Sequence, residues 1–188
     1  MNIFEIKRTM IEKGIPVEVI ENFVFPETED ETPEEKIAFA DQMDKLLTKE
    51  QILSVMEEQG CEKYEHEPEY AEKMLKLNGK SLEERIEILH SDNNEYAKAF
   101  YTLNSNGTLS IHWDFTENGK YRCVCSIIGK LPKHTAVSLT FCGCCSGHIK
   151  YHSEKSLGIK LRLVETVSSP ISSNGEKYCE HRFEIIEK

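Results

Sequence analysis

The sequence has no long uninterrupted apolar run and contains a single tryptophan. Its first fourteen residues, MNIFEIKRTMIEKG, interleave charged with apolar side chains, so we expect neither a signal peptide nor a membrane span. The 188 residues suit one domain and are enough to bury a hydrophobic core without disulfides. These features predict a cytoplasmic protein that does not bind membranes.

Basic residues are scarce in the first part of the chain. Residues 1–98 contain 25 Asp and Glu against 12 Lys and Arg, a net charge of −13, whereas residues 99–188 contain 8 acids and 11 bases, or +3. Binding to phosphates needs clustered Lys and Arg, so a nucleic-acid partner is not expected. The sequence also lacks a Gly-rich phosphate loop, paired catalytic carboxylates and a Gly-x-Ser-x-Gly elbow.

Cysteine and histidine, by contrast, are frequent and concentrated. Six of the seven cysteines and five of the seven histidines lie after residue 98. An odd number of cysteines in a reducing compartment argues against a disulfide scaffold and favours thiol chemistry or metal binding. Any chemistry of this chain is therefore expected in residues 99–188.

The first part has the pattern of helices that begin at capping boxes. Three pairs combine a Ser or Thr with a Glu or Gln three residues later: Thr32 and Glu35, Thr48 and Gln51, and Ser81 and Glu84. Apolar residues at helical spacing follow each pair. Because no Gly/Ser-rich linker follows, we expect residues 1–98 to be an acidic helical segment packed on a Cys-rich module at 99–188, within one compact domain.

After residue 99 the apolar residues alternate with polar ones, as they do in a half-buried strand. Hairpin signals at Asn106-Gly107 and Asn118-Gly119 flank the alternating residues 109–115. This pattern predicts a three-stranded antiparallel meander over residues 99–128.

The rest of the chain predicts one helix and two strands. Residues 145–157 have helical spacing and end at Gly158, a residue typical of helix C-termini. Strand patterns follow at residues 159–163 and 179–185. The expected fold is therefore α+β: an N-terminal helical layer packed on a mostly antiparallel sheet, with one helix inserted before the last two strands.

The expected hairpin brings together a first set of candidate ligands. With Asn118-Gly119 as the turn, Asp114 lies opposite Cys123 and His112 lies opposite Cys125, so that all four face the same side of the sheet. Zinc accepts these ligand types. The alternative is that the cysteines are small buried hydrophobic residues and that the other two are solvated.

The second set lies in the stretch TFCGCCSGHIKYH, residues 140–152. Cys142, Cys144 and Cys145 are expected just before, or in, the first turn of the helix, where the helix dipole favours thiolates. Three chemical interpretations stay open: a metal site completed by Cys179 or His181, a nucleophile with a histidine base, and a redox pair of thiols. The non-chemical alternative is tight docking of the helix on the sheet through Gly, Ser and Cys.

The nucleophile hypothesis assigns catalytic roles to specific residues. Cys144 or Cys145 would be the nucleophile and His148 the general base. His148 and His152 are four residues apart, so they are expected on one face of the helix.

The stretch from Cys142 to Ile185 resembles vinyl-reductase-like domains and the related bacterial proteins known as aminothiazoline-carboxylate hydrolase-like. The resemblance rests on the Cys-rich start with Gly-His, the helix ending in Leu-Gly, the strand IKLRLVET, and the run GEKYCEHRF, in which three residues instead of one separate Cys179 from Phe183. It covers about a quarter of the chain. It implies an α+β fold, a pocket for a small hydrophobic molecule and, in some members, a cysteine-bound metal. The residues it carries over are Cys142, Cys144, Cys145, Cys179 and His148.

The primary hypothesis is a small-molecule-binding or sensing protein with a Cys/His zinc site and a small hydrophobic or heterocyclic ligand. The metal ligands would be Cys142, Cys144, Cys145 and Cys179, with Cys123, Cys125, His148 and His181 as secondary candidates. Since zinc takes four ligands, some of these must be bystanders. The alternative is a thiol-dependent hydrolase acting on a small cyclic C–N or C–S substrate. A third hypothesis is an interaction protein whose acidic helices dock a partner. The sequence is compatible with a homodimer.

Overall fold

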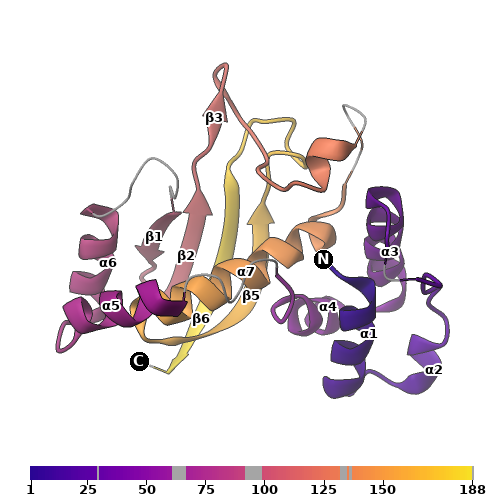
Figure 1. Ribbon diagram of the computed structural model, residues 1–188, viewed down its shortest axis with the longest axis horizontal. Helices are drawn as coiled ribbons and strands as arrows, with labels where there is room; N and C mark the ends of the chain where they lie inside the picture. The colour runs from indigo at the N-terminus through magenta and orange to yellow at the C-terminus, as the bar shows by residue number, and fades with distance from the viewer. Residues whose placement is uncertain (29, 61–66, 92–98, 132–134, 136, 188) are drawn as a thin grey trace.

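The computed structural model describes residues 1–28, 30–60, 67–91, 99–131, 135 and 137–187. Within them it confirms the α+β fold, with helices packed on an antiparallel sheet (Figure 1). The helices are α1 (Ile3–Glu12), α2 (Val17–Ile20), α3 (Pro33–Leu46), α4 (Lys49–Met56), α5 (Glu67–Leu77), α6 (Leu82–Ser91), the short 3₁₀ helix η1 (Ile128–Lys130) and α7 (Leu139–Leu157). The strands are β1 (Ala99–Leu103), β2 (Thr108–Trp113), β3 (Thr116–Glu117), β4 (Lys120–Tyr121), β5 (Lys160–Ser168) and β6 (Cys179–Glu187).

All three expected capping boxes are present. The Thr32 hydroxyl accepts a hydrogen bond from the backbone N–H of Glu35, whose carboxylate accepts one from Thr32 N–H. The boxes at the starts of α4 and α6 have the same reciprocal bonds. Each box satisfies two N–H groups that have no partner within the helix, so these helix starts follow from local sequence.

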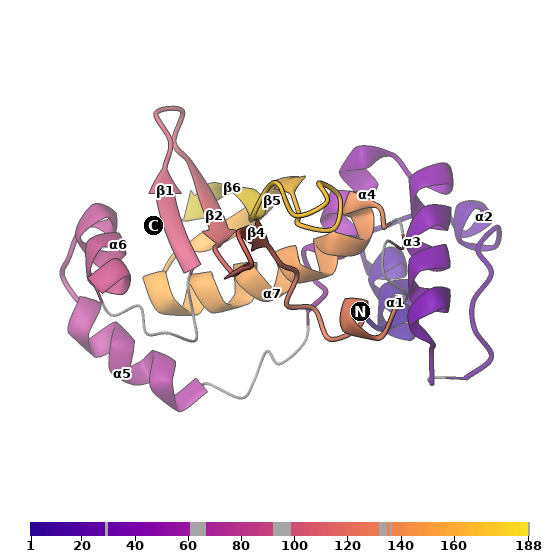
Figure 2. The same cartoon turned by 90° about the horizontal axis from the view of Figure 1, so that it is seen from above.

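The strands of the main sheet are ordered β1-β2-β6-β5, and every neighbouring pair is antiparallel. Helix α7, which precedes β5 and β6 as expected, lies across one face of the sheet (Figure 1). Figure 2 shows α1–α4 gathered around one end of α7 and α5 and α6 around the other. Helices α3 and α5 contact α7, whereas α4 and α6 contact both α7 and the sheet, α4 at β5 and α6 at β1.

The expected meander over residues 99–128 is wrong in its third strand. β1 and β2 do pair, but the other neighbour of β2 is β6, with Leu109 opposite Phe183 and Ile111 opposite His181. Leu109, Ile111, Phe183 and His181 are fully buried. The distant β6 thus offers β2 a longer apolar surface than the adjacent segment does, and burial decides strand pairing over proximity in sequence.

The second hairpin signal is confirmed on a smaller scale. Asn118 and Gly119 have φ values of 52° and 75° and connect β3 to β4, with Thr116 opposite Tyr121. Positive φ at both central residues is the geometry that favours Asn-Gly in two-residue hairpin turns. β3 and β4 form only a short separate ribbon.

Helix α7 begins six residues before the expected position. Its N-cap is Ser138, whose hydroxyl accepts a hydrogen bond from Phe141 N–H, and it ends as expected at Gly158, with φ 66°. The expectation that the cysteines lie before or in the first turn of the helix therefore holds only for Cys142 and is wrong for Cys144 and Cys145, which lie in the second turn. Cys142 is already the fourth helical residue, beyond the N–H groups that lack partners at a helix start.

Two glycines let α7 approach the end of α4 closely. A Cβ atom at Gly147 would lie 1.8 Å from the backbone oxygen of Gln59, and one at Gly143 would lie 2.8 Å from Cβ of Met56. Only glycine leaves room for this crossing. The small-residue seam considered from the sequence is thus present, but the glycines pack against helix α4 instead of the sheet.

The buried side chains form two cores on either side of this crossing. One consists of side chains from α1–α4 together with Val137, Phe141 and Cys144. The other consists of side chains from α6, the second half of α7 and the sheet, including Ile149, Leu161 and Phe183. We call them the helical core and the sheet core.

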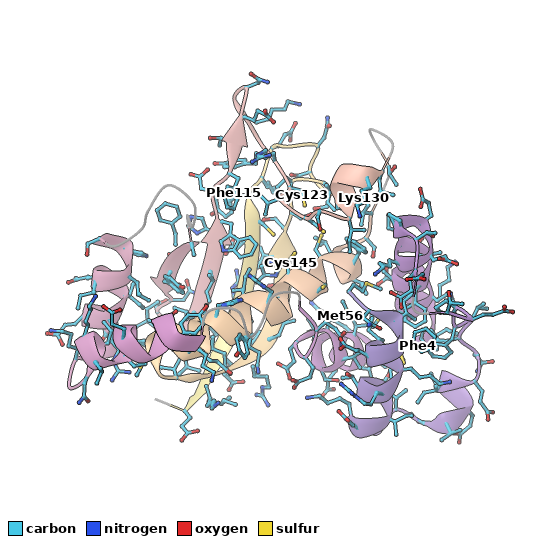
Figure 3. The ribbon with its side chains drawn as sticks, in the orientation of Figure 1. Phe4, Met56, Phe115, Cys123, Lys130 and Cys145 are labelled. Carbon is cyan, nitrogen blue, oxygen red and sulfur yellow. The ribbon has the colours of Figure 1, made fainter. Side chains whose placement is uncertain are left out.

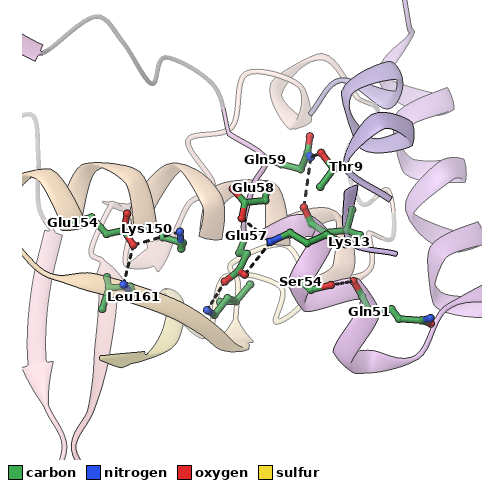
Figure 4. A network of polar contacts seen from close by, with 12 residues as sticks. Thr9, Lys13, Gln51, Ser54, Glu57, Glu58, Gln59, Lys150, Glu154 and Leu161 are labelled. Carbon is green, nitrogen blue, oxygen red and sulfur yellow. Dashed lines mark hydrogen bonds and ion pairs between the residues drawn. The ribbon is translucent and has the colours of Figure 1, made fainter. Parts of the chain in front are cut away.

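Two glutamates cover the outer edge of the sheet at β5. The carboxylate of Glu154 on α7 accepts a hydrogen bond from Leu161 N–H at 2.8 Å, and that of Glu57, after α4, accepts one from Leu163 N–H at 2.8 Å (Figure 4). Lys150 and Lys13 approach these carboxylates at 3.3 and 3.7 Å. Two donors of the edge strand are therefore occupied within the chain, which protects the edge from pairing with another strand.

Candidate functional site

The neighbouring residues Cys144 and Cys145 have different surroundings. Cys144 belongs to the helical core, next to the side chains of α1–α4. Cys145 lies toward Cys179 of β6, and the next residue, Ser146, bonds to β6 directly. The 100° turn per residue of an α-helix separates the two sulfurs in this way.

A buried polar chain connects α7 to the sheet. Ser146 Oγ lies 3.1 Å from Thr166 Oγ1 and 2.5 Å from His181 Nδ1, and His181 Nε2 lies 3.3 Å from Cys179 Sγ. The side chains of Ser146 and His181 are completely inaccessible to solvent. Both ring nitrogens of a buried histidine thus have partners, as burial of polar groups requires.

Burial lowers the pKa of His181 to about 3, so the imidazole is neutral at physiological pH. A neutral imidazole has one N–H and one lone pair. With the proton on Nδ1, the ring donates to Ser146 and presents its Nε2 lone pair to Cys179. This tautomer leaves Nε2 available to bind a metal ion.

Cysteines from three segments surround this chain. Burial raises the pKa of Cys145, and the charge of Cys179 raises it further; burial likewise raises the pKa of Cys179, with a further contribution from Cys142. Burial raises the pKa of Cys142 to about 12, with the charges of Cys123 and Cys125 adding to it. We call these five residues, Cys123, Cys125, Cys142, Cys145 and Cys179, the thiol cluster.

The raised pKa values keep the thiols of Cys142, Cys145 and Cys179 protonated at neutral pH, which opposes the expected activation by the helix dipole. All six cysteines in the described part of the chain are free. In Figure 3, Cys123 lies on the segment after β4, above Cys145 on α7. Within the described residues, no three His, Cys, Asp or Glu side chains are already arranged to hold a metal ion.

The histidines of α7 lie in an aromatic cluster. The His148 and His152 rings are 4.1 Å apart, which confirms their shared face, and the His148 ring packs edge-on against Trp113 at 5.6 Å. The Tyr70 hydroxyl contacts His152 Nδ1. Because Cys144 packs in the helical core and burial raises the pKa of Cys145, a nucleophile paired with His148 gains no support.

The four-residue set expected from the second hairpin is not assembled by its register. Arg122 N–H still bonds to Phe115 O at 2.8 Å, but the residues opposite His112 are Phe100 and Glu180, not Cys125. The His112 ring stacks between Phe100 and Tyr178, at 5.0 and 4.3 Å. The long strand β6 takes the place that the hairpin partner was expected to occupy.

A partly open cavity of about 440 Å³ borders the thiol cluster at Cys123. It lies between the segment around β4, η1 and the turn at residues 170–175. Apolar side chains make up much of its wall, among them Ile128, Leu131, Val137 and Ile171. Its volume is within the range of small-molecule sites. We call it the ligand cavity.

Sequence reasoning identified Cys179 and His181 on one strand face but missed Ser146 and Thr166. Ser146 lies in the Cys-rich stretch and follows Cys142 by four residues, so helical spacing alone would have placed both on one face. The contact with Thr166 depends on how β5 packs, which local sequence does not show.

Comparison with protein-family models, with curated proteins and with solved structures found no match to this chain. The resemblance to vinyl-reductase-like domains therefore stays a prediction. Among the residues with a described structure, none of the helices has both the length and the apolar composition needed to cross a bilayer.

Proposed function

We propose that this chain is a cytoplasmic small-molecule-binding or sensing protein that holds a zinc ion at Cys179, His181 and thiols of the thiol cluster. The observation that carries the proposal is the pair of neighbouring donor atoms Cys179 Sγ and His181 Nε2, 3.3 Å apart, with Ser146 on the other ring nitrogen.

The spacing of this pair suits a tetrahedral ion. Zn–S bonds of about 2.3 Å and Zn–N bonds of about 2.0 Å separate neighbouring ligand atoms by roughly 3.5 Å. Ligating histidines almost always donate their second N–H to a protein group that fixes the ring, and Ser146 is placed to accept it. Ser146 is fixed in turn by Thr166 at 3.1 Å.

Cys145 and Cys142 supply the other two thiols in this proposal. Among the neighbouring charges, that of Cys179 raises the pKa of Cys145 most. In the same way, the charge of Cys142 raises the pKa of Cys179 most. The proposal requires these side chains to rotate between staggered rotamers, because no three ligands are already arranged around one point in the described residues. Cys123 and Cys125, whose charges also raise the pKa of Cys179, are the next candidates, although Cys125 packs against the helical core. We assign Cys144, a buried member of that core, as a bystander.

Protonated thiols give the site a definite pH dependence. Because burial raises the pKa of Cys142 and Cys145, each of these residues must release a proton when it binds the ion. Zinc affinity should therefore increase steeply with pH around neutrality. Competition with a chromophoric chelator at several pH values measures it.

Metal content provides the direct test of the proposal. Protein purified without an affinity tag should contain about one zinc per chain by elemental mass spectrometry. Cys179→Ala should remove the metal, whereas the matched control Cys144→Ala should retain it. Metal-free wild-type protein, or equal zinc in both variants, would overturn the proposal.

A further inference from the structure

The ligand cavity has an uneven distribution of charge. Lys120 is the one ionised side chain among its described lining residues, and no Asp or Glu belongs to them. This is unusual for a chain with 33 acidic residues against 23 basic ones. A cavity with a cationic rim and no acidic group favours an anionic ligand.

The Lys120 ammonium has N–H donors available for a ligand. It donates one hydrogen bond, to the backbone oxygen of Asn174 at 3.3 Å, and an ammonium has three N–H donors. Asn174 belongs to the turn that closes the cavity on this side, so the contact holds the ammonium at the rim.

The rest of the cavity is suited to hydrocarbon. Ile128, Leu131, Val137 and Ile171 contribute aliphatic surface, and the side chain of Cys123 adds a weakly polar group. A chain or ring occupying this space would remove these surfaces from water, which is the main source of affinity in such sites.

We propose that the ligand cavity binds a small apolar carboxylate, with its hydrocarbon part among Ile128, Leu131 and Ile171 and its carboxylate at Lys120. This inference rests on the small-molecule part of the proposed function and does not require the metal. Cys123 is the residue shared by the cavity wall and the thiol cluster, so the ligand would contact one member of that cluster.

Octanoate and the uncharged 1-octanol are the matched probes for calorimetry. Octanoate should bind saturably at one site and about fivefold more tightly than 1-octanol, the size of effect expected of one exposed charge pair. Lys120→Gln should remove this preference, and Lys45→Gln, the same charge change on α3, should retain it. Equal binding of both probes to wild-type protein, or no binding of either, would overturn the proposal.

Two further measurements locate the site. Ile171→Trp and Leu131→Trp each fill the cavity and should abolish octanoate binding, with folding verified by circular dichroism. Octanoate should also slow the alkylation of Cys123 by iodoacetamide in chelator-treated protein. Octanoate binding that persists in both folded Trp variants would contradict this site.

Zinc content measured on the same samples separates the two proposals. Protein that contains zinc but does not bind octanoate would overturn the carboxylate proposal and leave the metal proposal intact. Protein that binds octanoate but never contains zinc would overturn the metal proposal and leave the carboxylate proposal intact.

Discussion

The two sides of helix α7 present residues of different chemistry. Toward α4 it presents Gly143 and Gly147, which allow a close crossing. Toward the sheet it presents Cys145 and Ser146, which join a buried chain of polar groups and thiols. Adjacent cysteines of one helix therefore have different roles: Cys144 contributes to packing, and Cys145 is a candidate ligand.

We expect the greatest loss of stability when the pH is lowered, because of His181 on the sheet side of α7. Burial lowers the pKa of His181 to about 3, whereas in the unfolded chain it is about 6.5. Below pH 6.5 the unfolded state therefore binds a proton that the folded state does not, and stability is lost as pH falls from 6.5 toward 3. The linkage amounts to up to about 5 kcal/mol at 1.36 kcal/mol per pH unit.

Urea unfolding of chelator-treated, zinc-free protein at several pH values measures this effect. His181→Gln should flatten the dependence between pH 6.5 and 4, and His90→Gln should leave it as in the wild type. Identical slopes in wild-type protein and His181→Gln would show that His181 is not buried as a neutral group.

The next prediction concerns the free energy of unfolding and the packing of α7 against α4. Gly147→Ala places a Cβ atom against the Gln59 backbone, which has to move, so we expect a loss of about 3 kcal/mol in the free energy of unfolding. Gly129→Ala is the control, because its Cβ would meet nothing within 4 Å. Equal unfolding midpoints for the two variants would contradict the close crossing.

A smaller effect separates a buried hydroxyl from an exposed one. Ser146→Ala leaves His181 Nδ1 without its buried partner and should cost about 2 kcal/mol. Thr140→Ala removes an exposed bond to Asp44 from the same helix and should cost less than about 1 kcal/mol. Thermal unfolding compares them, and a Ser146 effect no larger than the Thr140 effect would argue against the polar chain.

The smallest effect tests the covered sheet edge. Glu154→Ala frees Leu161 N–H and should cost about 1.5 kcal/mol, as expected for a bond to a charged acceptor. Glu184→Ala removes an exposed ion pair with Arg162 and should cost about 0.5 kcal/mol or less. Equal losses in chemical denaturation would show that Glu154 does not protect the edge.

Local signals predicted much of the fold. The capping boxes, the Gly158 helix end, the Asn118-Gly119 turn and the buried alternation of β5 and β6 are all present. Each depends on residues close in sequence. By contrast, the β2–β6 pairing joins residues about 70 positions apart and depends on which strand buries more surface. Sequence alone does not settle that competition.

The sequence predicted the candidate site only in part, because some of its contacts join residues that are far apart in the chain. Strand alternation placed Cys179 and His181 together, and the structure brings Cys142 and Cys145 near them. The early start of α7 was missed because the Gly and Cys of residues 142–145 have low helix propensity, although Ser138 supplied an N-cap. The choice between Cys144 and Cys145 needed the positions of α4 and β6.

Cobalt(II) substitution is a direct spectroscopic test for a thiolate–imidazole metal site on the sheet side of α7. Cobalt-loaded wild-type protein and Cys144→Ala should both show thiolate-to-cobalt charge-transfer absorption and the visible bands of a tetrahedral ion. Cys145→Ala and Cys179→Ala should lose or strongly weaken both features. Absence of these bands from the wild type, or their persistence in both sheet-side variants, would contradict the account.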